Sequence, residues 1–262
     1  MIVCALEEGQ QSSAAAGCTA WLRESLSMPL RLEGAAGDDL IAATHSEARL
    51  LVVGARGSDS AQLTLVLSVV DAAPVPVVVL PEAATDLWGD PHRARRNSRP
   101  NAVCGTDGSP IAADAAALAG ELGARLGGRL VITHAVTEPL PRGPGWSPQS
   151  TDGVSGPLRA AERSLLLSRT LAELRECPAE ICFRELYGDP VEVLDWVGSA
   201  ESAAFIAVGT SGIGRSRLAL AGSIAASLAS RATRPVLVIP VVGAPDPGRD
   251  SAERGSTPSY DS

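Results

Sequence analysis

The sequence contains no lysine, and all 22 of its basic side chains are arginines. This absence excludes three kinds of chemistry. A phosphate loop of the Walker A type needs a lysine, Schiff-base catalysis needs a lysine amine, and a protein kinase needs the lysine of its third strand. A phosphate-binding site in this chain must therefore rely on backbone groups, hydroxyls or arginines.

Aromatic residues are also scarce, at 3% of a chain whose hydrophobic content is 45%. The core must then be built from Ala, Val, Leu and Ile, which suits a parallel sheet buried under helices. No apolar run approaches the roughly 20 residues of a membrane span, and we expect neither a signal peptide nor a membrane partner.

Cysteines are few and scattered, and basic residues are outnumbered by acidic ones. The five cysteines predict reduced thiols in the cytoplasm, and their spacing argues against a metal site. The net charge of −8 argues against a general nucleic-acid surface.

Residues 205–241 carry the clearest functional signal. An apolar run typical of a buried strand is followed by a glycine-rich segment with a definite spacing: Gly209, two residues, Gly212, nine residues, Gly222-Ser223. A segment rich in Ala and Ser then predicts a helix. Glycines let a backbone approach an anion, and a helix start adds N–H groups beside the Ser223 hydroxyl. The pattern predicts a phosphate-binding loop, and a tight turn without a ligand is the alternative.

Apolar runs alternate with helical segments along the chain, which predicts an α/β fold with doubly wound parallel sheets. Strands are expected at residues 2–6, 29–33, 50–53, 75–80, 102–105, 130–136, 181–186, 205–208 and 236–239. Helices are expected at residues 12–27, 38–48, 111–126 and 157–176, and in the segment that ends near Ala200.

Three short motifs occur twice in the same order, which indicates an internal repeat. They are IVCA and AVCG, VGARG and VGTSG, and PVVVLP and PVLVIP. We therefore predict two tandem domains at residues 1–83 and 101–242, a linker at 84–100 and a disordered tail at 243–262. The first copy is truncated, since the stretch from Cys4 to Gly54 is about half as long as that from Cys104 to Gly209. We expect it to have lost its pocket.

The gapless glycine spacing and the repeated motifs resemble the universal stress protein family, over nearly the whole chain except the linker and the tail. The resemblance implies a tandem member with an adenine nucleotide alpha hydrolase-like fold, which binds ATP, with or without Mg²⁺, in the second copy. It assigns the adenosine side to Gly105, Thr106, Asp107 on the ribose, and Ala135 at the adenine edge. It places Val208 and Gly209 beside the ribose, and the phosphates at Gly212, Gly222, Ser223 and Ile224.

Several of these residues have a structural alternative. Asp107 is equally a helix cap, and Asp189 in Gly188-Asp189-Pro190 is predicted to be one. His134, beside Ala135, has no identifiable catalytic partner, and Arg215 and Arg217 fit a solvated loop as well as a phosphate contact.

The leading hypothesis is a cytoplasmic ATP-binding regulatory protein that is not an enzyme. The alternatives are an interaction module with a vestigial pocket and a weak ATP-hydrolysing enzyme. The resemblance also implies that the last strands of two domains pair antiparallel, here within one chain, and a homodimer is the other form that such pairing can take.

Overall fold

The computed structural model describes residues 2–6, 18, 22–24, 27, 29–34, 49–54, 66–70, 73–84, 100–137, 168–210 and 224–240. Its strands are β1 (Ile2–Leu6), β2 (Leu30–Gly34), β3 (Leu50–Gly54), β4 (Val77–Leu80), β5 (Ala102–Gly105), β6 (Leu130–Val136), β7 (Ile181–Tyr187), β8 (Phe205–Gly209) and β9 (Val236–Ile239). The helices with described bounds are the 3-10 turn η1 (Glu82–Ala84), α6 (Pro110–Arg125), α8 (Pro190–Ala200) and α9 (Ile224–Arg231).

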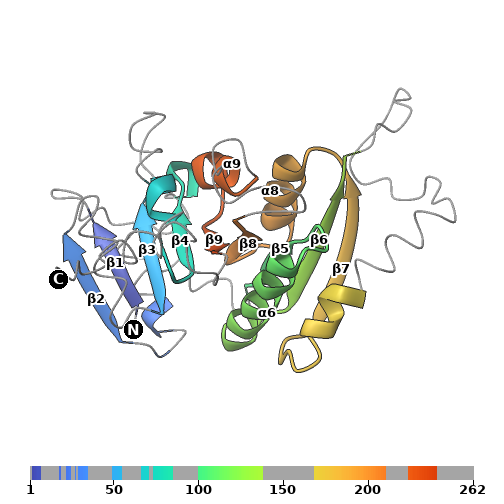
Figure 1. Cartoon of the computed structure of the whole chain (residues 1–262), viewed down its shortest axis with the longest axis horizontal. Helices are drawn as coiled ribbons and strands as arrows, with labels where there is room; N and C mark the ends of the chain where they lie inside the picture. Colours follow the sequence, from blue (N-terminus) through green and yellow to red (C-terminus); the bar gives the residue numbers. More distant parts are fainter. Residues whose placement is uncertain are drawn as a thin grey trace, which may run out of the picture.

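These strands form one nine-stranded sheet in the order β2-β1-β3-β4-β9-β8-β5-β6-β7, with β2 and β7 at its two ends (Figure 1). Neighbouring strands are parallel at every position but one. Strands β4 and β9 pair antiparallel, with Val77 opposite Val238 and Val79 opposite Val236. The two proline-flanked strands thus lie side by side and antiparallel, as the family resemblance implies, and they join what would otherwise be two sheets.

Each side of this antiparallel pair repeats one connection pattern among the described strands. On one side the order is β2-β1-β3-β4, and on the other it is β6-β5-β8-β9 with β7 added at the end. The strand boundaries agree with the sequence prediction to within two residues. The largest shift is at β4, which begins at Val77 because Pro76 has no N–H group to give to a ladder.

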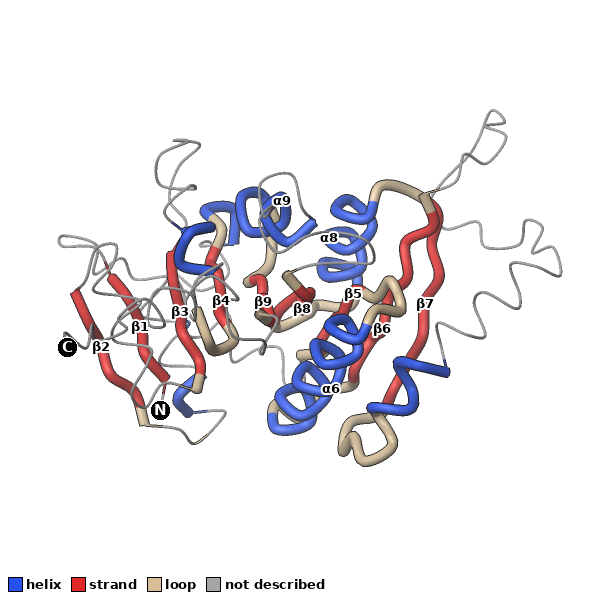
Figure 2. Tube along the Cα trace, viewed as in Figure 1, coloured by secondary structure: helices blue, strands red, loops and turns tan. Residues whose placement is uncertain are grey.

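Helices cover both faces of the sheet (Figure 2). Side chains of α8, α9 and residues 66–70 share one buried cluster with the sheet, while α6 and residue Leu174 share the other. Helix α6 contacts the sheet through alanines and glycines, which allows a close approach and agrees with the low aromatic content. None of the described helices is long and apolar enough to cross a membrane.

Capping residues determine where two helices begin. The Ser109 hydroxyl accepts a hydrogen bond from Ala112 N at 3.3 Å, and Asp189 Oδ1 accepts from Val191 N at 2.9 Å. Each helix has proline in its first turn, where a missing N–H costs nothing. The predicted capping role of Asp189 is therefore confirmed, and α6 starts one residue earlier than predicted.

Candidate functional site

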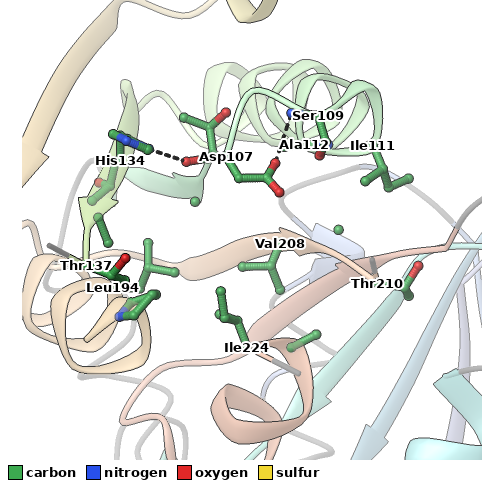
Figure 3. A pocket seen from close by; sticks show the side chains of 17 residues that line it. Asp107, Ser109, Ile111, Ala112, His134, Thr137, Leu194, Val208, Thr210 and Ile224 are labelled. Carbon is green, nitrogen blue, oxygen red and sulfur yellow. Dashed lines mark hydrogen bonds between the residues drawn. The ribbon is translucent and has the colours of Figure 1, made fainter. Parts of the chain in front are cut away.

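A cavity of about 380 Å³ opens at the carboxyl ends of β5, β6 and β8 (Figure 3). From β5 the chain crosses to β6 on one side, while β8 lies on the other side. In a doubly wound sheet this change of direction leaves a crevice at the strand ends, where ligands bind. The size is within the range of small-molecule sites.

Seven of the ten site residues predicted from the sequence line this cavity. They are Gly105, Thr106, Asp107, Ala135, Val208, Gly209 and Ile224. The other three, Gly212, Gly222 and Ser223, lie outside the described residues, as do Arg215, Arg217, the predicted tail and the interior of the predicted linker. The described part of the predicted phosphate loop is therefore its two ends, at β8 and at α9.

The structure adds lining residues that the sequence analysis did not assign to the site. They are Ser109, Ile111, Ala112, Thr133, Thr137, Pro190, Leu194, Thr210 and Ala225, together with His134. Thr133 could have been found by strand periodicity, since it lies two residues before Ala135 and so faces the same side of β6. Ile111 and Leu194 have no comparable signal, because they reach the cavity through the packing of helices on opposite faces of the sheet.

The turn that follows β5 is held by its own side chains. Gly108 N donates to Thr106 Oγ1 at 3.1 Å, and Ser109 N donates to Asp107 Oδ1 at 2.9 Å. Gly108 has a φ of 76°, a left-handed conformation that glycine adopts without strain. Asp107 is therefore not the cap of α6, which is Ser109, but it holds the turn before that helix. It also lies at the cavity, where Figure 3 shows its carboxylate pointing into the space opposite Val208.

His134 holds the same turn from the neighbouring strand. Its Nδ1 lies 2.9 Å from the main-chain oxygen of Thr106. A carbonyl oxygen can only accept a hydrogen bond, so Nδ1 carries a proton and donates it, and Nε2 of the neutral ring is an acceptor. The contact gives His134 a structural role at the site.

Two glycines at strand ends allow close packing around the cavity. A β-carbon at Gly105 would lie 2.8 Å from Leu194 Cδ1, and one at Gly209 would lie 2.8 Å from Ile111 Cγ1. Gly54 ends the corresponding strand β3 of the other half, and a β-carbon there would meet nothing within 4 Å among the described residues. A β-carbon would therefore have to displace the side chain of Leu194 at β5 or of Ile111 at β8, whereas no described residue restricts Gly54 in this way.

The polar side chains of the described lining are hydroxyls, the His134 ring and one carboxylate, with no arginine among them. Three helices, α6, α8 and α9, begin at the cavity. Helix amino ends favour negative charge. The Thr133 hydroxyl is 1% exposed and finds no hydrogen-bond partner among the described residues, which leaves a polar group at this wall that costs about 1–3 kcal/mol unless satisfied.

Behind the site, Cys104 is buried in β5. Burial raises the pKa of its thiol to about 12, so the thiol is neutral at physiological pH. The part of the chain that the structure describes has no group of three His, Cys, Asp or Glu residues placed to hold a metal ion.

The sheet order, the cavity at the strand ends and the glycine-bordered turns define an α/β protein of the universal stress class. The universal stress protein family model matches residues 99–240, which is more than half of the sequence, and the chain belongs to this family. Among curated proteins, no match to the chain was found.

Two solved structures with TM-scores above 0.5 show the same fold. A universal stress protein from Archaeoglobus fulgidus DSM 4304 is 19% identical, with a TM-score of 0.55, 84% of this chain and 74% of that one being covered. A protein of unknown function from Pseudomonas aeruginosa PAO1 is 13% identical, with a TM-score of 0.51 and coverage of 92% and 81%. A universal stress protein from Archaeoglobus fulgidus in complex with dAMP is 21% identical, with a TM-score of 0.41 and coverage of 54% and 98%.

Proposed function

We propose that this universal stress protein is a cytoplasmic regulatory protein that holds one ATP per chain in the cavity formed by residues 101–242. Its function is binding, and the nucleotide alters the affinity of the protein for a partner.

The observation that carries the proposal is the position of Asp107. Its carboxylate faces a cavity at the switch point of the sheet, on a turn fixed by hydrogen bonds to Gly108 N and Ser109 N. A carboxylate at this point accepts hydrogen bonds from vicinal ribose hydroxyls. The apolar side chains of Leu194 and Val208 lie opposite, as Figure 3 shows, and they suit the faces of a nucleobase.

The other end of the cavity suits phosphates. Ile224 and Ala225, in the first turn of α9, line it together with the end of β8. We propose that residues 209–223 close over the phosphates between these two points, with Gly212, Gly222 and Ser223 as donors. Magnesium would then travel with ATP, held by phosphates and water.

We also propose that residues 1–83 are a shortened first copy of the domain formed by residues 101–242, joined to it by a linker at residues 84–100. The support is the repeated order of the described strands on either side of the β4–β9 pair. In this proposal the first copy serves as the partner of β9 and contributes no lining residue to the described cavity.

Calorimetry on the purified chain tests the nucleotide proposal. ATP is expected to bind with a stoichiometry of one. Asp107→Ala should weaken ATP binding by about 10- to 100-fold, the range for a hydrogen bond to a charged group. Asp114→Ala, an exposed carboxylate on α6, is the matched control and should leave the affinity unchanged.

Three results would contradict the proposal. They are the absence of ATP binding, a stoichiometry of two equivalent sites, and equal weakening by the two aspartate variants. Parallel titrations with AMP and with cAMP show whether the phosphate end prefers a triphosphate, and tighter binding of either one would replace ATP as the ligand.

A further inference from the structure

Thr106 is held through each of its polar groups. Its N–H donates to Thr133 O at 2.9 Å, and its carbonyl accepts from His134 at 2.9 Å. Its hydroxyl accepts from Gly108 N and also lies 3.2 Å from the hydroxyl of Thr170. Three of these four contacts come from β6 and from the turn itself. The contact with Thr170 is the one that comes from a distant part of the chain.

Thr170 is not among the cavity-lining residues. It belongs to the helical residues 168–173, on the same face of the sheet as α6, and its side chain is 1% exposed. Nearby Leu174 anchors this segment in the core with α6 and the sheet. Apolar packing would be served as well by valine, which has the shape of threonine without the hydroxyl. The hydroxyl adds a contact that packing does not supply, with the buried hydroxyl of Thr106 at 3.2 Å.

We infer that Thr170 is a positioning residue of the nucleotide site. It fixes the hydroxyl of Thr106, and through it the turn that presents Asp107 to the ribose. The inference rests on the proposed function. It adds that ribose recognition depends on a side chain 64 positions away from Thr106, in a helix that does not line the cavity.

The Thr106 hydroxyl connects Thr170 to the turn through two contacts. The Thr106 hydroxyl accepts the Gly108 N–H that closes the turn, while it also shares a proton with Thr170. When the partner at 170 is removed, a buried hydroxyl loses a hydrogen bond and can rotate away from Gly108 to find another. Gly108 and Asp107 are adjacent, so the carboxylate loses its position in the same movement.

The test compares ATP with 2′,3′-dideoxy-ATP, which lacks the ribose hydroxyls. The wild-type chain should prefer ATP, because Asp107 accepts from those hydroxyls. In Thr170→Val the affinity for ATP should fall by about 3- to 10-fold, as expected for one neutral hydrogen bond, while the affinity for the dideoxy nucleotide stays the same. Thr170→Ser keeps the hydroxyl and should restore the preference.

Two further variants separate positioning from general stability. In an Asp107→Ala background, Thr170→Val should cause no additional loss of ATP affinity, since the group that it positions is gone. Ser199→Ala breaks an exposed hydroxyl pair away from the cavity, Ser199 with Thr233 at 3.0 Å, and should leave both affinities unchanged. If Thr170→Val unfolds below the assay temperature, Thr170→Ala is used in its place.

The outcomes are distinct. A wild-type chain that binds neither nucleotide overturns the proposed function, and the inference falls with it. A wild-type chain that binds both nucleotides equally removes the role given to Asp107 and overturns the inference. If ATP and dideoxy-ATP weaken together in Thr170→Val, in step with a lower melting temperature, Thr170 is merely structural. An unchanged preference for ATP in that variant also overturns the inference.

Discussion

Ile111 packs onto the backbone of Gly209 so closely that a β-carbon at position 209 would lie 2.8 Å from its Cγ1 and 2.9 Å from its Cγ2. The two residues come from different elements, α6 and the end of β8, and both line the cavity. Their contact closes one side of the site. It also explains why glycine is required there although its φ is an ordinary one.

Gly209→Ala is therefore expected to push Ile111 aside or to move the end of β8. Overpacking of this kind lowers the free energy of unfolding by about 1–3 kcal/mol. Nucleotide affinity should fall as well, because the cavity wall moves. Denaturant unfolding and calorimetry measure the two effects. Gly54→Ala is the matched control at the end of β3, where a β-carbon would meet no described residue within 4 Å, and it should change neither quantity.

If Gly209→Ala keeps both its stability and its nucleotide affinity, the close contact with Ile111 is not a constraint on the site. If Gly54→Ala weakens nucleotide binding as strongly as Gly209→Ala does, the site is not confined to the half that carries β8.

Asp189 begins helix α8 and bears indirectly on the cavity. Its Oδ1 accepts from Val191 N at 2.9 Å and from Glu192 N at 3.2 Å, and the following residues Pro190 and Leu194 line the site. Asp189→Ala should lower the free energy of unfolding by about 1 kcal/mol. Asp189→Ser can still cap and should recover most of that loss. Thermal melting of the two variants and the wild type measures these differences. Equal melting temperatures for Asp189→Ala and the wild type would contradict the capping role.

The strands could be predicted because of where they lie. A strand such as Val77–Leu80 is buried on both faces, so it is a continuous apolar run bounded by prolines. The residues of strand β7, by contrast, are half-buried over most of its length, and its end was placed one residue short of Tyr187. The order of the strands does not follow from such runs. The β4–β9 pair was expected from the family resemblance, not from the residues alone.

The residues of the candidate site likewise fall into those that were predicted before the structure and those that only the structure reveals. Gly209 was found from the spacing of the glycines, whereas Gly105 and Asp107 were assigned to the site through the family resemblance. Leu194, Ile111 and Thr170 were not, because each reaches the site through a helix packed across the sheet from a distant part of the chain. Their sequence context is that of any amphipathic helix, so only the tertiary structure reveals them.

Glu201 ties α8 to the amino ends of the strands, opposite the cavity. Its Oε2 accepts from Arg129 Nη2 at 2.8 Å and its Oε1 from Arg184 Nη2, while its own side chain is 8% exposed. Burial acts to raise the pKa of Glu201, but the hydrogen bonds and charges of Arg129 and Arg184 outweigh it and hold the pKa below its ordinary value of 4.5. The folded state therefore favours the ionised form.

It follows that Glu201 contributes stability that is present above pH 4.5 and is lost as the pH falls through the lower folded-state pKa. Glu201→Gln should be less stable than wild type at neutral pH by about 1–3 kcal/mol. It should also lose less stability than wild type on acidification below pH 4.5. Urea unfolding across this range measures both effects.

The matched control for Glu201 is Glu121→Gln, which removes an exposed ion pair with Arg125 in which the glutamate is 53% exposed. Its effect should stay below about 1 kcal/mol. If the free energy of unfolding falls equally with pH in the wild type and in Glu201→Gln, the pKa of Glu201 is not lowered by folding.

The last prediction concerns the pair of proline-flanked strands. In the whole chain β9 has β8 on one side and β4 on the other, with Val78 opposite Leu237 in the antiparallel ladder. A fragment of residues 101–242 keeps every described cavity-lining residue and loses β4, so that β9 becomes an exposed apolar edge. Such an edge pairs with another chain unless it is covered. We expect this fragment to bind nucleotide with an affinity close to that of the whole chain and to self-associate through β9, as seen by analytical ultracentrifugation. Residues 1–83 alone have the smaller sheet and should be poorly folded. A fragment that stays strictly monomeric with the melting temperature of the whole chain would show that β4 is not needed to shield β9.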